Sequence, residues 1–349
     1  MKITHIHIER FRGFQNEDFE VGSLLTAIAG QNGTQKSTLL GIITQTFTLK
    51  TEDSMRVEKP LCGGSYISAF KDKFRLSPTF DKPKGHEWTI SFDAGMDDFT
   101  VESIKRTGDP NVRFWKKGAR QEGDGYISFP TIFLSLKRLV PVAEEAKIIT
   151  DDTLLTQEEL NEFKQLHNKI LIAQTPISSA TTITSKNKQS IGVSTELYDW
   201  NQNSMGQDNL GKIILALFSF KRLHDKYPRQ YKGGILAIDE MDATMYPASQ
   251  VELLKVLRKY ASKLNLQILF TTHSMSLLKA MDDLVQEVTK KEETANQAKI
   301  VFLKKVDDKI AIKQGVNFKG IQLDLNVVAE GNNRKKNRIT AYTEDKENI

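Results

Sequence analysis

Short, largely apolar runs alternate with amphipathic stretches along much of the chain. Each apolar run is five or six residues long, which is typical of a strand that is buried on both faces. The amphipathic stretches, at residues 207–227 and 248–264, carry apolar side chains at helical spacing. Strands of this kind separated by helices predict an α/β fold whose parallel sheet is covered on both faces. The apolar runs are residues 24–29, 131–136, 234–238 and 266–270.

Shorter strands are predicted near both ends of the chain and in one segment between them. Residues 3–9 alternate polar and apolar side chains, and residues 19–21 are their expected hairpin partner. Residues 51–124 are rich in Gly, Pro and aromatic side chains, so we expect a small β-rich insertion in a large domain that spans residues 1–330. The strands expected in the insertion are 88–92, 99–105 and 112–115, and a last hairpin is expected at 300–303 and 309–313.

Two further helices and one loop follow from local signals. Residues 38–50 come directly after the first apolar run and its loop, and we expect them to be helical. Thr156, with acidic residues after it, is typical of a helix N-terminus, which predicts a helix at 156–172. The stretch 173–189 is polar and rich in Ser and Thr, so we expect a loop there, followed by a strand at 191–195.

The composition is that of a globular chain with a packed core. Of the 349 residues, 39% are hydrophobic and 27% are charged. No apolar run approaches the roughly 18 residues that a membrane helix needs, and the opening residues lack the apolar core of a signal peptide. Cys62 is the only cysteine, so we expect a reducing, cytoplasmic location without membrane contact. The net charge of +5 permits contact with nucleic acid without requiring it.

The first apolar run leads into a segment that is almost a phosphate-binding P-loop. Residues 30–37 are Gly-Gln-Asn-Gly-Thr-Gln-Lys-Ser, which fits the pattern G-x-x-x-x-G-K-[ST] except at Gln35, where a glycine is usual. Backbone N–H groups of such a loop, with the N-terminus of the helix behind it, hold a polyphosphate. Lys36 is expected to reach the β- and γ-phosphates, and the Ser37 hydroxyl to bind Mg²⁺.

Two acidic residues end the apolar run 234–238. Asp239 lies where P-loop enzymes bind Mg²⁺, and Glu240 is placed to polarise an attacking water. The alternative is a strand that ends in ordinary solvated acids. The P-loop earlier in the chain favours the metal and catalytic roles, because the two motifs belong to one kind of site.

Two more motifs complete the set. His273 follows the apolar run 266–270 and would face the γ-phosphate, although a surface histidine beside a helix start is the alternative. Ser204 and Gly206 stand just before the helix at 207–227, where a hydroxyl, a glycine and a helix N-terminus make a second anion site. A simple N-cap by Ser204 is the alternative there, and the two roles are compatible.

These four motifs, in this order, resemble the ABC-type ATPase superfamily. The Ser-x-Gly-Gln element at 204–207 is similar to the signature motif of that superfamily, and His273 to its switch histidine. Within the superfamily the chain resembles the RecF, SMC and OLD-like branch. Segments that carry this resemblance are Ile-His-Ile-Glu-Arg-Phe-Arg-Gly-Phe at 6–14, Gln-Asn-Gly at 31–33, Leu-Ser-Leu-Lys-Arg-Leu-Val-Pro at 134–141 and Asp-Glu-Met-Asp-Ala-Thr-Met-Tyr-Pro at 239–247.

The resemblance implies an ABC-type ATPase head with a mixed or parallel sheet flanked by helices, which binds ATP and Mg²⁺ as a head-to-tail homodimer. Each ATP would lie between Lys36 of one chain and the Ser204–Gly206 element of the other. Glu240 and His273 are the implied catalytic residues, and Ser37 and Asp239 the implied metal ligands. The implied nucleotide-binding residues are Gly30, Asn32, Gly33, Gln35, Lys36, Ser37, Thr38, Arg12, Ser204 and Gly206.

Arg12 belongs to this set because the opening basic residues of related proteins touch the nucleotide phosphates or base. A solvated charge on an edge strand is the alternative for Arg12. Gln35 suggests firm nucleotide binding with slow hydrolysis, because its side chain occupies a loop position that usually favours the conformational freedom of glycine.

The resemblance extends to ATPases of bacterial anti-phage systems such as Septu, Gabija, PARIS and the retron-associated systems. These ATPases work with a nuclease, so the resemblance implies a nucleotide-gated regulator of a nuclease that is fused or is a separate subunit. Three alternatives stay open: a RecF-like repair ATPase that binds duplex DNA, a transporter subunit, and a pseudo-ATPase that binds without hydrolysing.

Residues 331–349 are expected to lie outside the ATPase domain. Residues 334–338 are a basic run, which is typical of a solvated linker. Residues 339–346 resemble the first strand and acid of a Toprim nuclease domain, with Glu344 as that acid. Metal-dependent cleavage needs clustered carboxylates, so one acid is insufficient. The segment is expected to be either the start of a truncated Toprim-like domain or an ordinary strand.

Overall fold

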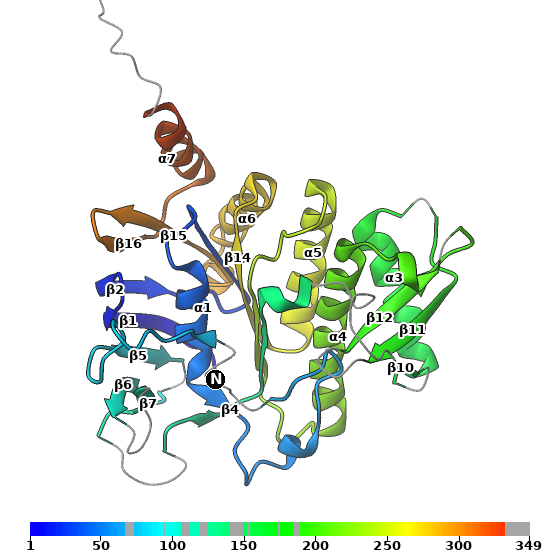
Figure 1. The fold of residues 1–349 in the computed structure, drawn as a ribbon, viewed down its shortest axis with the longest axis horizontal. Helices are drawn as coiled ribbons and strands as arrows, with labels where there is room; N and C mark the ends of the chain where they lie inside the picture. The colour runs from blue at the N-terminus through cyan, green and yellow to red at the C-terminus, as the bar shows by residue number, and fades with distance from the viewer. Residues whose placement is uncertain are drawn as a thin grey trace, which may run out of the picture.

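A six-stranded sheet lies at the centre of the molecule, with the strand order β16-β15-β3-β14-β13-β9 (Figure 1). All neighbouring strands are parallel except β15 and β16, which form an antiparallel hairpin. The computed structural model describes residues 1–66, 73–93, 95–105, 112–118, 124–139, 149–151, 154–173, 175–184, 189–197 and 199–331. The strands are β3 (Leu25–Gly30), β9 (Thr131–Leu134), β13 (Gly234–Ile238), β14 (Leu266–Thr272), β15 (Ala298–Val306) and β16 (Lys309–Lys313).

The strands are apolar on both faces because each face of the sheet covers its own hydrophobic core. Along β3, Ala27 and Ala29 belong to one core, while Ile28 between them belongs to the other. Helices α4, α5 and α6 fill the first core, and helix α1 with an antiparallel sheet closes the second (Figure 1). The predicted α/β fold with a covered sheet is therefore confirmed. The helices are α1 (Lys36–Gln45), α4 (Met205–Lys226), α5 (Pro247–Lys263) and α6 (Met275–Val288).

The antiparallel sheet has the strand order β2-β1-β5-β6-β7. Its first two strands are the expected opening hairpin. The other three come from the segment 51–124, and β5 pairs directly with β1, with Ile6 opposite Ile90 and Ile8 opposite Trp88. The strands expected in that segment are present, and they extend the N-terminal hairpin into one sheet. The strands are β1 (Ile3–Phe11), β2 (Phe14–Glu20), β5 (Glu87–Phe92), β6 (Phe99–Lys105) and β7 (Val112–Lys116).

The helix expected at 38–50 is shorter than predicted. It ends at Gln45, and the chain continues into β4 (Phe47–Thr48), which pairs in parallel with β8 (Ile127–Ser128). Phe47 is fully buried and its ring packs edge-on against that of Phe92. Burial of this aromatic side chain against the antiparallel sheet outweighs the helical pattern that precedes it.

The loop expected at 173–189 was wrong, because this stretch contains a strand. β11 (Ser179–Thr184) pairs antiparallel with β12 (Gln189–Ser194) on one side and with β10 (Ile149–Asp151) on the other (Figure 1). The polar composition concealed the strand, since threonine is both polar and β-branched and therefore suits a pleated sheet.

Hydrogen-bonded caps fix the starts of two long helices. Thr156 forms a capping box with Glu159 at the start of α3 (Gln157–Leu171), as the sequence suggested. Ser204 forms another with Gln207 at the start of α4, so this helix begins two residues before the expected position. In the described ranges the remaining helical elements are η1 (Ser54–Val57), η2 (Leu136–Leu139), η4 (Trp200–Gln202), η5 (Glu292–Thr294) and α7 (Phe318–Gly331).

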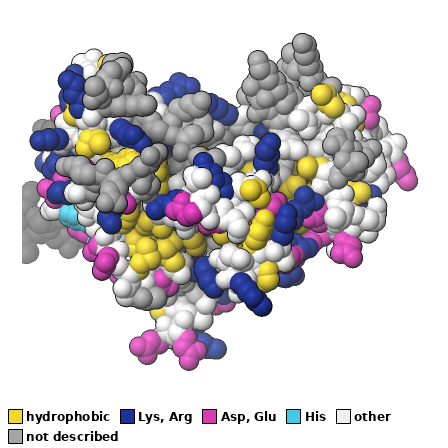
Figure 2. Space-filling view, turned by 90° about the horizontal axis from the view of Figure 1, so that it is seen from below, with side chains coloured by type: hydrophobic (Ala, Val, Ile, Leu, Met, Phe, Trp, Pro, Cys, Tyr) yellow, Lys and Arg dark blue, Asp and Glu magenta, His cyan; other side chains and the backbone are white. Residues whose placement is uncertain are grey.

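The surface carries both signs of charge. On the face seen from below, Lys and Arg side chains lie among Asp and Glu side chains, with a group of apolar side chains between them (Figure 2). No helix in the described part of the chain is long and apolar enough to cross a membrane. The basic run 334–338 and the Toprim-like segment with Glu344 lie outside the described residues.

Candidate active site

The carboxyl ends of β3, β14 and β13 lie next to one another, because these parallel strands are neighbours in the sheet. Each end carries one of the motifs: the P-loop 30–37 follows β3, His273 follows β14, and Asp239 and Glu240 follow β13. The carboxyl edge of parallel strands is where α/β proteins bind their ligands. The fold therefore brings these motifs together although they are far apart in the sequence.

A hydrogen bond joins the P-loop to the acidic strand end. The Ser37 hydroxyl donates to Oδ1 of Asp239 over 2.8 Å. The Thr271 hydroxyl donates to the same oxygen at 2.7 Å, and its Oγ1 accepts from the Glu240 N–H at 2.6 Å. Ser37 and Asp239 thus present a hydroxyl and a carboxylate, which are the hard oxygen ligands that Mg²⁺ takes together with substrate phosphates.

Lys36 is folded back into the P-loop. Its Nζ donates to the carbonyl oxygens of Gly30 at 3.1 Å and Gln31 at 2.9 Å. Burial lowers the pKa of Lys36, against an opposing effect of Glu240, Asp239 and Asp242. The ammonium therefore has uncharged oxygens as its hydrogen-bond partners, and a phosphate in the loop would offer it a charged one.

The backbone of the P-loop has the shape that glycine favours at three positions. Gly30 has a φ of 152°, and a Cβ there would lie 2.5 Å from the carbonyl oxygen of Leu303. Gly33 has a φ of 81° at the exposed tip of the loop, beside Asn32. Gln35, at the N-cap of α1, has a φ of 63° and a ψ of 31°. This left-handed conformation costs a residue with a side chain about 1–2 kcal/mol.

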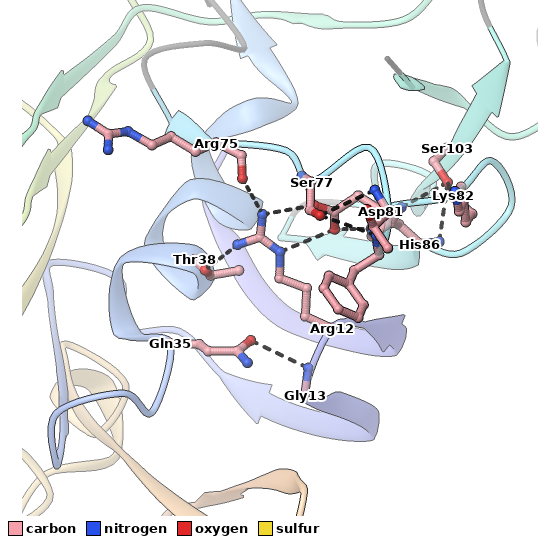
Figure 3. A network of polar contacts seen from close by, with 12 residues as sticks. Arg12, Gly13, Gln35, Thr38, Arg75, Ser77, Asp81, Lys82, His86 and Ser103 are labelled. Carbon is pink, nitrogen blue, oxygen red and sulfur yellow. Dashed lines mark hydrogen bonds and ion pairs between the residues drawn. The ribbon is translucent and has the colours of Figure 1, made fainter. Parts of the chain in front are cut away.

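The Gln35 side chain lies against the turn between β1 and β2 (Figure 3). Its Oε1 accepts a long hydrogen bond from the Gly13 N–H at 3.4 Å. A Cβ at Gly13 would lie 2.9 Å from Nε2 of Gln35, so a side chain at Gly13 would require the Gln35 amide to shift. The residue that breaks the P-loop pattern thus connects the P-loop to the β1–β2 turn.

The same turn is tied to α1 through Arg12 (Figure 3). The Arg12 guanidinium donates to both carboxylate oxygens of Asp81 at 3.2 Å, to Thr38 Oγ1 at 3.2 Å and to the Arg75 carbonyl at 2.7 Å. Arg12, expected at the nucleotide, therefore reaches the P-loop helix at Thr38 while Asp81 neutralises its charge. His86 supports the arrangement from behind, with Nε2 at 3.0 Å from Asp81 Oδ1.

His273 is exposed beside the P-loop and the acids. Burial of part of its ring lowers the pKa of His273, and Lys36 lowers it further, while Asp242, Glu240 and Asp239 act in the opposite direction. The neutral imidazole is therefore favoured at pH 7, and it can accept or donate a hydrogen bond.

Ser204 and Gly206 occupy the N-terminus of α4. The Ser204 hydroxyl accepts from the Gln207 N–H at 3.3 Å, so the N-cap role of Ser204 is present. A Cβ on Gly206 would lie 2.5 Å from the Thr244 carbonyl oxygen, so this helix start packs directly on the loop that follows Glu240. Met205 between them is 48% exposed, which leaves the helix start open to a second surface.

Four residues that the sequence did not single out contact this site. Thr271 bonds Asp239, and a second group of buried polar side chains binds the backbone of the loop after Asp239. Only one of them had a signal in the sequence, since Arg138 lies in the segment 134–141 that resembles related ATPases. The members of the second group are Arg138, Asn209 and Gln250.

Comparison with known proteins identifies the class. The sequence matches the AAA ATPase domain family over residues 1–189 and 137–278. These matches cover most of the chain, so the chain belongs to this family and is an ATPase domain. No curated protein matches the sequence.

The fold is similar to solved structures of ATPase heads. An SMC head bound to the C-terminal winged-helix domain of ScpA is 14% identical, with a TM-score of 0.51 over 92% of this chain and 100% of that chain. The SMC head domain from Thermotoga maritima is 14% identical, with a TM-score of 0.48 over 90% of this chain and 100% of that one. The recombination mediator protein RecF of the RecFOR pathway is 12% identical, with a TM-score of 0.44 over 90% and 98% of the two chains. The first of these shows that the fold is that of an SMC head.

Proposed function

We propose that this ATPase domain hydrolyses ATP at composite sites formed by two copies of the chain arranged head to tail. The observation that carries the proposal is the 2.8 Å hydrogen bond between Ser37 and Asp239, which joins the P-loop to the acidic strand end. A strand that merely ends in solvated acids would not place a carboxylate with 5% exposure against the P-loop hydroxyl.

The residues at the carboxyl edge of the sheet each have a role in this proposal. Lys36 and the backbone N–H groups of residues 30–37 bind the β- and γ-phosphates. Ser37 and Asp239 would hold Mg²⁺, which supplies charge neutralisation on the phosphates when bound. Glu240 orients the attacking water as general base, and neutral His273 hydrogen-bonds the γ-phosphate.

The partner copy supplies the other half of the site. The N-terminus of α4, with Ser204 and Gly206, presents a hydroxyl and the positive end of the helix dipole, which suit an anion. Two apolar side chains near it are exposed, Met205 at 48% and Tyr246 at 81%. A dimer that buries them around the nucleotide explains both features, and ATP then stabilises the closed dimer because its contacts exist only there.

We propose that the dimer gates a nuclease partner in anti-phage defence, in the cytoplasm. The sequence resemblance to the OLD-like group supports this, and the ATPase domain of residues 1–330 would carry the switch. The mixed charge of the face in Figure 2 gives no one-signed surface on its described residues, which favours a protein partner over duplex DNA on that face. DNA binding with a steep salt dependence would instead favour a repair role.

Turnover of two variants tests the proposed chemistry. Glu240→Gln keeps the shape of the side chain and removes its basicity, so it should bind ATP, dimerise and lose at least about a hundredfold in turnover. Lys36→Ala is the control for binding, because it should lose ATP affinity and dimerisation together. Wild-type turnover in Glu240→Gln would show that Glu240 is not the base.

A further inference from the structure

Two buried side chains hold the loop that follows Asp239. Arg138, in η2, donates Nη2 to the Glu240 carbonyl at 2.8 Å. Asn209, in the second turn of α4, donates Nδ2 to the Ala243 carbonyl at 2.9 Å. The two side chains also bond each other, since Arg138 Nε donates to Asn209 Oδ1 at 2.7 Å. Their exposures of 4% and 0% exclude water from this contact.

The loop needs such support because its backbone is strained. Glu240 has a φ of 49° and Thr244 a φ of 67°, which are left-handed conformations that disfavour residues with side chains. Strained positions persist only where the surroundings determine them. The hydrogen bonds from Arg138 and Asn209 provide that constraint, so they determine the backbone position that carries the Glu240 side chain.

Arg138 is poorly suited to a purely stabilising role. Burial lowers the pKa of Arg138 to about 10, although Asp239, Glu240 and Asp242 oppose the effect. Within the described residues its hydrogen bonds go to neutral oxygens, including the carbonyls of Leu134 and Ser135. A buried charge without a directly bonded carboxylate opposes folding, which points to a positioning role.

The other end of the contact is the start of α4. Asn209 lies one turn after Gly206, which itself packs against the Thr244 carbonyl. Direct contacts therefore join the first two turns of α4 to the loop 240–244. Through these contacts a displacement of the helix N-terminus would act on the Glu240 backbone.

We propose that Arg138 and Asn209 are positioning residues that couple the two nucleotide sites of the dimer. This inference rests on the proposed function, in which the α4 N-terminus contacts the nucleotide of the partner while Glu240 acts on the nucleotide of its own P-loop. Contact with the partner's nucleotide fixes α4, and the bonds through Asn209 and Arg138 then align Glu240. Each site is thus competent for hydrolysis only when the other is occupied, so the coupling acts on turnover and not on ATP affinity.

Asn209→Asp tests the coupling with little change in shape. It keeps an acceptor for Arg138 but loses the donor to Ala243. We expect unchanged ATP affinity and ATP-dependent dimerisation and turnover lowered about a hundredfold. At a protein concentration that saturates dimerisation, the Hill coefficient of turnover for ATP should fall from about two to one. Arg138→Lys is the second variant, since an ammonium lacks the planar fork with which the guanidinium binds both Glu240 and Asn209, and it should give the same pattern.

Gln250→Glu is the matched control. Gln250 donates to the Met245 carbonyl at 2.9 Å and the Asp242 carbonyl at 3.2 Å, and it accepts from the Ser274 hydroxyl, so it connects the same loop to α6 and not to α4. This variant removes donors to the loop as Asn209→Asp does. It should lower turnover while the Hill coefficient remains about two.

Several results would overturn the inference. Asn209→Asp with wild-type turnover and Hill coefficient would do so, as would a parallel fall of turnover, ATP affinity and melting temperature, which indicates a structural role only. A lowered Hill coefficient in Gln250→Glu as well would show that the α4 contact is not specific. Wild-type turnover in Glu240→Gln would instead refute the proposed function itself.

Discussion

At the scale of single residues, the P-loop keeps its backbone shape although Gln35 departs from the usual sequence motif. The sequence indicated that Gln35 occupies a position where glycine is usual, and the backbone there is left-handed as that argument requires. The sequence did not indicate the partner of its side chain, because Gly13 lies in the turn between β1 and β2, 22 residues away along the chain. Backbone constraints of a motif can be predicted locally, whereas contacts across elements cannot.

Gln35→Gly should relieve the strain and release the β1–β2 turn. We expect turnover to rise several-fold with ATP affinity nearly unchanged, since phosphate binding uses backbone N–H groups. Gln35→Asn is the control, because asparagine tolerates the left-handed region but its shorter amide does not reach Gly13. Steady-state turnover and nucleotide titration measure both effects, and a Gln35→Gly variant identical to the wild type would show that the substitution is neutral.

The buried His167 makes the stability of the protein depend on pH. It is 1% exposed and stacks on Phe163, and neither ring nitrogen has a hydrogen-bond partner within the described residues. Burial lowers the pKa of His167 from 6.5 to about 4. The pKa of His167 is lower in the folded protein than in the unfolded chain. Its contribution to stability is therefore present above pH 6.5 and is lost as the pH falls toward 4.

Urea unfolding at two pH values measures this loss. Between pH 7 and pH 5 the wild type should lose about 2 kcal/mol of unfolding free energy through His167, in addition to contributions from other groups. His167→Leu should lose correspondingly less over the same interval. Equal losses of unfolding free energy in the two proteins would show that the folded protein binds a proton on His167 as readily as the unfolded chain does.

At the scale of elements, the sequence predicted what depends on local pattern and missed what depends on packing. Three apolar strands and the motifs at their ends were predictable, because burial on both faces leaves a clear run of residues. The threonine-rich strand β11 was not, since its polar composition resembles a loop. Arg138 and Asn209 belong to separate elements and meet only in the folded chain, so spacing along the sequence carried no sign of their contact.

At the same scale, the ion pair between Arg12 and Asp81 connects separate elements, and a single substitution removes it. It links the β1–β2 turn and α1 to the segment that leads into β5 (Figure 3). Asp81→Asn should lower the unfolding free energy by about 1–3 kcal/mol, because a partly buried guanidinium loses its carboxylate. It should also raise ATP affinity a few-fold, since the freed guanidinium lies at Thr38.

Calorimetric titration of Asp81→Asn with ATP checks the second effect. The matched control is Glu87→Gln, which removes a carboxylate of β5 that binds Arg10 of β1 at 2.9 Å. This control should leave ATP affinity unchanged. Lower ATP affinity in Asp81→Asn would show that Arg12 must stay in place and does not reach the nucleotide.

At the scale of the whole molecule, the proposed function requires that one chain carries two halves of different sites. The P-loop and the acids lie at the carboxyl edge of the sheet, and the start of α4 presents Ser204 to a second surface. Head-to-tail pairing with a twofold axis makes both sites equivalent, because each copy gives one half and receives the other. The central claim of the account is therefore that an active site is shared between two chains.

Mixing two inactive variants tests that claim most directly. Lys36→Ala removes the P-loop half, and Ser204→Asp keeps the helix cap but sets a negative charge against the phosphates. Each variant alone should stay monomeric in the presence of ATP. An equal mixture should form mixed dimers with ATP, because each mixed dimer contains one complete site, and energy transfer between labelled variants measures this pairing. If the mixture also stays monomeric while both variants are folded, the site is not shared between chains.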